Sequence, residues 1–233
     1  MFRSDINYPK VSVVVPFYNS SETIDETLCS VEAQTYPSVE IIVVNDGSNE
    51  YHSNKLKQIL SNRLHVQLVE QPNKGVASAR NLGARQASGV YFCFLDSDDV
   101  IKPQYLSACV EVLKDPKVKL VYTKAEFIGA REGNWNLPPY EGLKSILLGN
   151  RIPNVALQRS KDFFELGGFD ESFRTHEDWD YWIRLLQNEG DVVCIQDVLF
   201  MYRKRSDGTS LIDQLEREPR RIQKKKKKIY DKH

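Results

Sequence analysis

Runs of β-branched and aromatic residues alternate with amphipathic stretches along the first half of the chain. These runs, which are typical of buried strands, occupy residues 11–15, 39–44, 65–69 and 90–95. Between them, apolar residues recur at helical spacing, as in Val76, Ala79 and Leu82, with Arg80 and Arg85 on another face. Strands and helices that alternate at this pitch predict right-handed crossovers and a mostly parallel sheet with helices on both faces.

The second half of the chain is less regular. Helices are expected near residues 103–114, 140–149 and 176–186, and strands near 118–122, 153–158, 191–195 and 198–202. Between residues 123 and 139 the periodicity fades, and Trp135 lies exposed among polar residues. This stretch is typical of a surface loop, although an aromatic ring on a loop also suits a sugar face.

Length and composition predict one soluble α/β domain. The chain has 233 residues, of which 41% are hydrophobic and 27% charged. No apolar run approaches the roughly twenty residues that span a bilayer, and the first residues lack the apolar core of a signal peptide. We therefore expect a cytoplasmic protein with a globular domain over residues 1–212 and a basic tail over 213–233.

The tail gives the chain an uneven charge distribution. Residues 220–233 contain eight Lys or Arg and one acid, so the rest of the chain is acidic. The run Lys224–Lys228 can contact an anionic surface, such as the inner face of a membrane, at its periphery. The alternative, a solvated or frayed helix end, needs no partner, and we expect no nucleic acid to bind.

The four cysteines predict neither a zinc site nor a disulfide framework. Cys29, Cys93, Cys109 and Cys194 are widely spaced, no C-x-x-C pair occurs, and the four His are far apart. Each cysteine lies in an apolar stretch, so we expect buried thiols.

Three carboxylates follow the apolar run at residues 90–95. Asp96, Asp98 and Asp99 come directly after it, and an unpaired ionised carboxylate is costly away from water. Open α/β sheets bind ligands at the carboxyl ends of their strands, so a divalent cation is one solution. Oxygen ligands suit Mg²⁺ or Mn²⁺ shared with a phosphate. The alternative is an acidic turn before a helix that begins near Pro103.

Phosphate-binding loops of the common kinds are absent from the sequence. No G-x-G-x-x-G follows the first strand and no Walker A sequence occurs, so a phosphate here would need the metal. A second acidic pair, Glu177 and Asp178, lies at the start of the helix expected over 176–186. Acids at a helix start also have a purely structural reading, because they favour the positive end of the helix dipole.

Five motifs in order resemble the family-2 glycosyltransferases with a GT-A fold. They are V-S-V-V-V-P-F-Y-N (11–19), V-V-N-D-G-S (43–48), N-K-G-V-A-S-A-R-N (73–81), L-D-S-D-D (95–99) and G-G-F-D-E with H-E-D-W-D (167–171, 176–180). The resemblance covers residues 10–205. It implies a Rossmann-like domain with a nucleotide-binding half over about 10–122 and an acceptor and catalytic half over about 123–212.

The resemblance implies how the donor nucleotide is held. Pro16, Tyr18 and Asn19 would line the base pocket, and Asp46 would accept the N3–H of a uracil-type base, which favours a UDP-sugar. A turn aspartate is the structural alternative for Asp46. The remaining residues with an implied nucleotide contact are Lys74, Arg80, Asp96, Ser97 and Arg203, with Arg203 closing over the diphosphate. For Lys74 and Arg80, simple surface charge is the alternative.

The resemblance also implies the metal ligands and the chemistry. Asp98 would ligate Mn²⁺ or Mg²⁺, with Asp96 on ribose or on the metal's water. Asp178 would be the general base for a hydroxyl of a glycan or glycolipid acceptor, with Glu177 beside it as a supporting acid. One base opposite a departing diphosphate gives single displacement with inversion.

The sequence departs from the family pattern in two respects. It has no Q-x-x-R-W motif and no membrane helix, so processive polymerisation is disfavoured. Residues 202–206 contain no His to complete a metal shell.

Two other functions stay open. A sugar-1-phosphate nucleotidyltransferase would need a glycine-rich basic loop after the first strand, which is missing. A non-catalytic nucleotide-sugar-binding module would have no need for Asp178.

Overall fold

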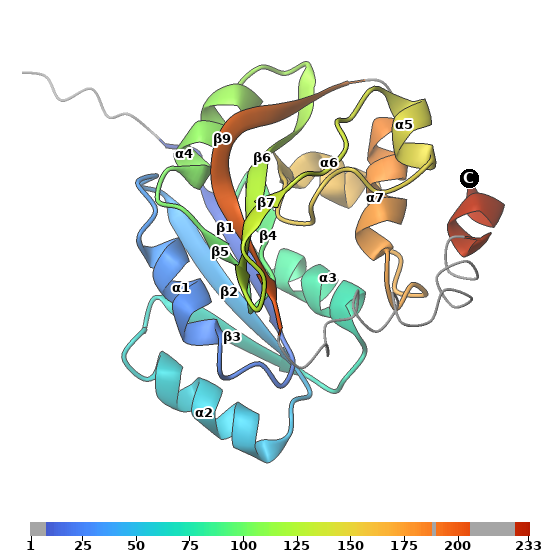
Figure 1. Cartoon of the computed structure of the whole chain (residues 1–233). Coiled ribbons are helices and arrows are strands. Elements are labelled where there is room, and N and C mark those ends of the chain that lie inside the picture. Colours follow the sequence, from blue (N-terminus) through green and yellow to red (C-terminus); the bar gives the residue numbers. More distant parts are fainter. Residues whose placement is uncertain (1–7, 188–189, 206–226) are drawn as a thin grey trace, which may run out of the picture.

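A twisted central sheet runs through the molecule (Figure 1). The computed structural model describes residues 8–187, 190–205 and 227–233. The strands in this part of the chain are β1 (Val11–Phe17), β2 (Val39–Asp46), β3 (Val66–Gln71), β4 (Tyr91–Phe94), β5 (Val100–Ile101), β6 (Val118–Gly129), β7 (Gly133–Trp135), β8 (Leu157–Arg159) and β9 (Asp191–Lys204). The helices are α1 (Ile24–Glu32), α2 (Glu50–Leu60), α3 (Val76–Gln86), α4 (Tyr105–Leu113), α5 (Leu143–Leu147), α6 (Ser160–Glu165) and α7 (Glu177–Leu186).

The sheet has the order β3-β2-β1-β4-β8-β6-β9-β5, and β7 pairs with β6. Strands β3, β2, β1 and β4 are parallel, and β6 and β9 are parallel to each other. Strand β8 joins the two groups through antiparallel pairs with β4 and β6. The carboxyl ends of β1, β2 and β4 therefore meet at one edge of the sheet, where the polar motifs follow them.

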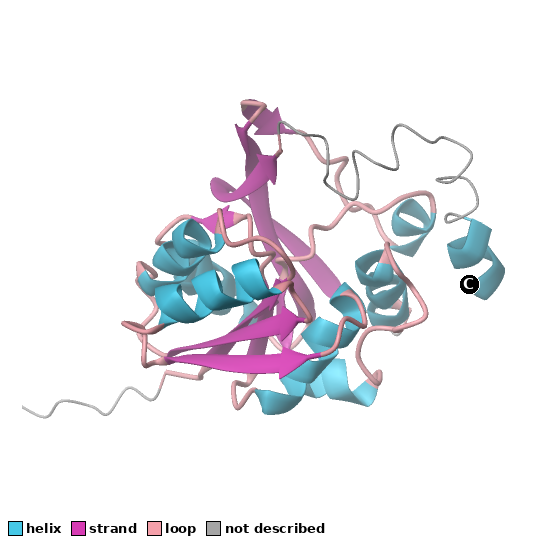
Figure 2. Cartoon of the chain, turned by 90° about the horizontal axis from the view of Figure 1, so that it is seen from below, coloured by secondary structure: helices cyan, strands magenta, loops and turns pink. Residues whose placement is uncertain are grey.

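Helices cover both faces of the sheet, as its two-sided burial requires (Figure 2). Every residue of β1 is buried. Ile24 and Leu28 of α1 and Leu106 of α4 pack in one apolar cluster, whereas Ala79 of α3 and Trp182 of α7 belong to the cluster on the other face. The predicted α/β fold is confirmed.

The stretch expected to be a loop, residues 123–139, is largely strand. Strand β6 continues to Gly129 and turns back into β7. Trp135 is half-buried because its ring packs against Tyr202, with 4.6 Å between the ring centroids. The prediction of an exposed Trp135 was wrong, since a polar edge strand next to β6 has no apolar alternation to reveal it.

Other boundaries also differ from those predicted. The two strands expected over 191–195 and 198–202 are one strand, β9, whose irregular register with β6 near Thr123 marks the place where the prediction divided it. Residues 153–156 lie before β8, and the short elements β5 and α6 were not predicted. Cys29 is exposed, contrary to expectation, whereas Cys93 and Cys109 are buried; all four cysteines are free thiols.

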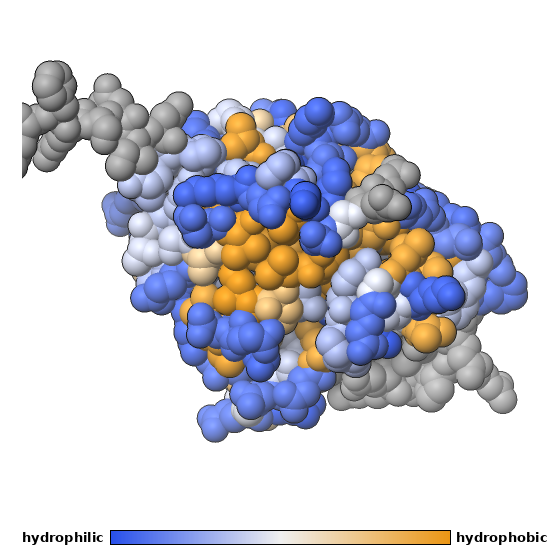
Figure 3. All heavy atoms as spheres, turned by 90° about the horizontal axis from the view of Figure 1, so that it is seen from above, coloured by the Kyte–Doolittle hydropathy of each residue, from blue (hydrophilic) through white to orange (hydrophobic). Residues whose placement is uncertain are grey.

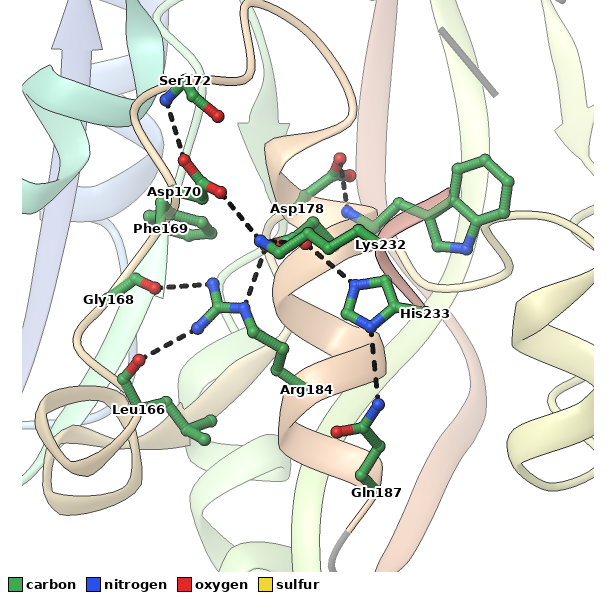
Figure 4. A network of polar contacts seen from close by, with 12 residues as sticks. Leu166, Gly168, Phe169, Asp170, Ser172, Asp178, Arg184, Gln187, Lys232 and His233 are labelled. Atoms are coloured by element: carbon green, nitrogen blue, oxygen red, sulfur yellow. Dashed lines mark hydrogen bonds and ion pairs between the residues drawn. The ribbon is translucent and has the colours of Figure 1, made fainter. Parts of the chain in front are cut away.

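The last described residues form a short helix on α7. Residues 227–232 are helical, and Ile229 is fully buried. Lys232 pairs with Asp170 and Asp180, and His233 Nε2 lies 2.9 Å from Asp180 Oδ1 (Figure 4). Most of the predicted basic tail, residues 213–226, lies outside the described residues, so its contact with a membrane stays a prediction.

Seen from above, apolar side chains gather at the centre of one face with hydrophilic residues around them (Figure 3). Within the described ranges, none of the helices combines the length and the apolar character that crossing a lipid bilayer requires.

Candidate active site

The acidic turn after β4 lies at the carboxyl edge of the sheet. Tyr91–Phe94 are buried throughout, and the backbone N–H of Leu95 still donates to the Val14 carbonyl oxygen of β1. The chain then leaves the sheet, so the side chain of Asp96 is 33% exposed, whereas Asp99 is fully buried. The carboxylates thus stand at the position where open α/β sheets bind ligands.

Arg80 joins this turn to the start of α7. Its guanidinium donates 2.6 Å to Asp96 Oδ1 and 2.5 Å to Glu177 Oε1, and its side chain is only 3% exposed. The two carboxylates raise the pKa of Arg80 despite its burial. The guanidinium also lies 5.6 Å from the ring centroid of Phe169.

The sequence placed Arg80 on another face than the inward residues of its helix, and this was wrong. Arg80 lies among the buried residues of α3, with Ala77 and Ala84. Apolar spacing cannot reveal such an arginine, because its burial depends on two carboxylates that are distant in the sequence. Its predicted contact with the nucleotide stays a prediction.

Asp98 and Asp99 are crowded by negative charge and approached by two arginines. Arg205 donates to Asp98 Oδ2 from Nε at 2.9 Å and from a terminal nitrogen at 2.8 Å. Burial and the charge of Asp96 raise the pKa of Asp98, and Arg205 opposes this shift. Burial also raises the pKa of Asp99, whose Oδ1 accepts the Arg203 backbone N–H while its Oδ2 has no partner among the described residues.

The residues expected around the nucleotide base come together between β1 and β2. Pro16 is buried in β1 beside Val44, whereas Tyr18 is 52% exposed. Asn19 adopts a left-handed conformation with φ of 49°. Its backbone N–H donates to Ser48 Oγ, and its Oδ1 accepts the backbone N–H of Asn49.

The side chain of Asp46, at the end of β2, bonds to the turn that precedes α3. Its oxygens accept hydrogen bonds from Gln71 Nε2 at 2.7 Å and from the backbone N–H groups of Lys74 and Gly75 at 2.8 Å each. Gly47 follows with φ of 67°, where an added Cβ would lie 2.4 Å from the backbone nitrogen of Asn73. The turn role is therefore observed, and the base contact stays a prediction. The side chain of Lys74 is exposed.

Ser97 and Arg203 tie the acidic turn to neighbouring elements. Ser97 Oγ lies 2.6 Å from Ser20 Oγ in the loop before α1. Arg203 Nε donates 2.7 Å to the Asp98 carbonyl oxygen, and a terminal nitrogen lies 2.5 Å from Glu26 Oε2. The Arg203 side chain therefore spans from β9 to α1 beside the carboxylates.

The second acidic pair begins α7 directly after His176, which has φ of 63°. Glu177 is buried and Asp178 is half-buried. Asp178 Oδ2 accepts a hydrogen bond of 2.8 Å from Asn150 Nδ2, and its Oδ1 accepts the Trp179 backbone N–H. Burial raises the pKa of both carboxyls, whereas the charge of Arg80 opposes the shift.

Three residues of this arrangement were not predicted from the sequence. Asn150 holds Asp178, Arg205 pairs with Asp98, and Ser20 contacts Ser97. The role of Arg205 had a partial indication in the sequence, because this basic residue lies two places after Arg203, directly after the end of β9. Asn150 had none, since it follows a short helix in an irregular stretch.

Asp96 and Asp98 have the donor chemistry for a hard divalent cation. Both offer carboxylate oxygens at the rim of the sheet, and Asp98 already attracts the cationic Arg205. Over the described ranges, no group of three or more His, Cys, Asp or Glu side chains is arranged to hold a metal ion. Asp96 and Asp98 are thus the carboxylates that would hold such a cation, and phosphate and water would supply its other oxygens.

The mostly parallel α/β sheet with helices on both faces matches the fold of GT-A glycosyltransferase structures. Residues 12–172 match glycosyl transferase family 2, so the chain belongs to this family. It is 33% identical over 185 residues to the chondroitin synthase of Escherichia coli, covering 76% of this chain and 26% of that protein. The chain spans 19% to 62% of the length of the curated relatives it matches.

Solved structures with the same fold are 21% to 23% identical. S. aureus TarS 1-349 in complex with UDP-GlcNAc superposes with a TM-score of 0.72, covering 84% of this chain and 59% of that chain. The mannosyltransferase PcManGT from Pyrobaculum calidifontis, in complex with GDP-Man and Mn²⁺, has a TM-score of 0.69 and covers 90% of this chain and 61% of that one. The predictions of the fold and of a glycosyltransferase family are confirmed.

Proposed function

We propose that this chain transfers a sugar from a nucleotide diphosphate donor, a UDP-sugar, to a hydroxyl of a glycan or glycolipid, with inversion. The observation that carries the proposal is that the Arg80 side chain pairs with both Asp96 and Glu177. These ion pairs hold the acidic turn after β4 close to the start of α7, where Asp178 lies. Two neighbours in fold that hold a nucleotide sugar support the donor class.

The donor would lie along the carboxyl edge of the sheet. Tyr18 and Pro16 would border the base, with Asp46 accepting its N3–H and Asn19, Ser97 and Lys74 nearby. The exposed ring of Tyr18 offers a face for stacking. In this proposal, residues of about 10–122 would hold the donor and residues of about 123–212 would hold the acceptor.

The diphosphate would lie beside Asp96 and Asp98, which would hold Mn²⁺ or Mg²⁺. When bound, the cation stabilises the negative charge that grows on the leaving diphosphate. Arg205 pairs with the Asp98 carboxylate and Arg203 donates to the Asp98 backbone carbonyl oxygen, so both can add positive charge there. The positive charge of the cation and of the two arginines would offset the charge of the carboxylates that gather at the carboxyl edge of the sheet.

Asp178 would accept the proton of the acceptor hydroxyl. A carboxyl is a stronger base when its pKa is raised, and burial raises that of Asp178. Asn150 and the Trp179 N–H fix its two oxygens, so it points in one direction. Glu177 is held by Arg80 and supports the position of Asp178.

The test is the replacement Asp178→Asn, assayed against a panel of nucleotide sugars. We expect donor binding to persist while transfer falls by a factor of about 10² to 10⁴. Asp197→Asn, at an exposed position on β9, is the matched control and should keep full turnover. Wild-type turnover in Asp178→Asn would refute the base, and donor binding without any turnover in the unaltered chain would favour the non-catalytic module.

A further inference from the structure

Trp179 directly follows Asp178 on α7, and its side chain is buried in the core. Its indole N–H donates 2.6 Å to the Ile146 carbonyl oxygen of α5. Both side chains belong to the same apolar cluster, and Trp179 is only 1% exposed. A buried indole N–H gains from such a partner, because leaving it unpaired would cost the hydrogen bonds it makes to water. The bond therefore joins α5 to α7 at Ile146.

The carbonyl oxygen that Trp179 holds also begins the turn after α5. It accepts the Gly149 backbone N–H at 3.2 Å, and Asn150 is the next residue. The position of Ile146 against α7 therefore fixes where Asn150 lies.

The Asn150 amide is oriented by its own loop. Its Oδ1 accepts the Ile152 backbone N–H at 3.2 Å, and its Nδ2 donates 2.8 Å to Asp178 Oδ2. The amide N–H group is thus directed at the carboxylate as long as the loop keeps its place.

Helix α5 is too short to keep that place by itself. It spans five residues, Leu143–Leu147, and a helix of this length is marginal without tertiary contacts. Arg151 Nε donates 2.7 Å to the Ser145 carbonyl oxygen, but this bond lies within the segment and does not hold it to α7. The packing of Ile146 and its bond from Trp179 do.

We propose that Trp179 is a positioning residue for the general base. Its indole bond to Ile146 fixes the end of α5, and the Asn150 amide is thereby held against Asp178. Trp179 acts through Asn150 rather than on a substrate. The proposal rests on the proposed transferase function, because it assigns a support to the base of that reaction.

The charged groups that act on Asp178 come from three elements: Arg80 of α3, Asp96 after β4 and Glu177 of α7. A change at Trp179 leaves these charges in place. The hydrogen bond from Asn150 lowers the pKa of Asp178, so loss of that bond raises it. Because the base must be deprotonated, the acid limb of the pH–rate profile then moves to higher pH.

The test compares Trp179→Phe with Trp182→Phe. Each variant keeps an aromatic ring in the core, but Trp179→Phe loses the bonded N–H, whereas the Trp182 Nε1 is buried without a partner in the described part of the chain. Donor hydrolysis is the assay, with water in place of the acceptor. We expect Trp179→Phe to lower kcat about tenfold, to change the donor KM by less than about twofold and to move the acid limb to higher pH. Trp182→Phe, the matched control, should do none of these.

Two further measurements separate positioning from a general loosening of the core. In Asn150→Ala, which lacks the bond to Asp178 already, adding Trp179→Phe should lower kcat by less than about twofold. Hydrogen exchange over residues 143–150 needs no activity, and it should be about tenfold faster in Trp179→Phe than in Trp182→Phe.

Equal kinetics of the two phenylalanine variants, additive effects with Asn150→Ala, or equal exchange over residues 143–150 would each overturn the proposal. If the unaltered chain still turns over a donor, such a failure leaves the transferase function standing. No turnover of any donor by the unaltered chain would refute that function, and the exchange measurement would still decide whether Trp179 holds the segment.

Discussion

Arg80 is a buried cation held between two carboxylates. Its desolvation is balanced by the ion pairs with Asp96 and Glu177, although its Nε has no partner in the described part of the chain. Removing one member of such a group is strongly destabilising, because it leaves uncompensated buried charge. Arg80 therefore serves stability and the geometry of the site together.

We predict that Arg80→Met lowers the free energy of unfolding by about 3–5 kcal/mol, since Glu177 would stay buried without its partner. Urea denaturation followed by circular dichroism measures this change. Arg85→Met, at an exposed position of the same helix, should change it by less than about 0.5 kcal/mol. Equal effects of the two replacements would show that the ion pairs do not support the fold.

A second prediction at the residue scale concerns pH. Burial raises the pKa of Asp178, and the hydrogen bond from Asn150 opposes the shift. A general base must be deprotonated, so kcat/KM should fall as pH falls through this raised pKa, above the ordinary value of about 3.9. Asn150→Ala removes a group that lowers the pKa, so it should move the acid limb to higher pH. An unmoved or lower limb in the pH–rate profile would count against Asp178 as the base.

At this scale the sequence predicts acids better than it predicts their partners. Asp96, Asp98, Glu177 and Asp178 follow apolar stretches or begin a helix, so local pattern finds them. The partner Asn150 depends on how distant segments fold together, and no local spacing encodes that.

At the scale of elements, close approach between α3 and the sheet depends on one small residue. An added Cβ on Gly83 would lie 2.4 Å from Val14 Cγ1 and 3.0 Å from Val44 Cγ2. Helix propensity alone would favour alanine here by about 1 kcal/mol. The short contact distances make an alanine at this position destabilising, because Val14 and Val44 are themselves fully buried and cannot move aside.

We therefore predict that Gly83→Ala lowers the free energy of unfolding by about 1–3 kcal/mol through overpacking. Thermal and urea unfolding measure this value. Gly149→Ala is the control, because an added Cβ there meets nothing within 4 Å. A stabilised Gly83→Ala protein would mean that α3 can shift away from β1 and β2.

The elements themselves were predicted well where both faces of a strand are buried. Strands β1, β2 and β4 are apolar runs and match their predicted positions, whereas β6 continues from residue 122 to Gly129 and β9 is not divided at residues 196–197. Burial alternates along the added part of β6, and residues 196 and 197 are exposed, so the hydrophobic signal there is weak. The pairing of β6 with β9, rather than local propensity, makes these segments strand.

For the whole molecule, topology brings the site together. Residues from α1, β4, α3, α7 and β9 meet at the carboxyl edge because β1, β2 and β4 are parallel. The strand–helix alternation predicted this edge. A helix end was one expectation for the basic tail, but as a solvated one, whereas Ile229 of the helix at residues 227–232 is buried and Tyr230 and Lys232 contact Trp179 and Asp180 of α7. These contacts join the last residues of the chain to the helix that carries Asp178.

The central claim is that Asp98 helps to hold a cation against the donor diphosphate. Titration calorimetry of UDP with and without Mn²⁺, on the unaltered chain and on Asp98→Ala, tests it, with Asp191→Ala at an exposed position as the control. We predict that Mn²⁺ strengthens UDP binding in the unaltered chain and the control, and that Asp98→Ala loses this metal-dependent gain. The same Mn²⁺-dependent affinity in Asp98→Ala would contradict the account.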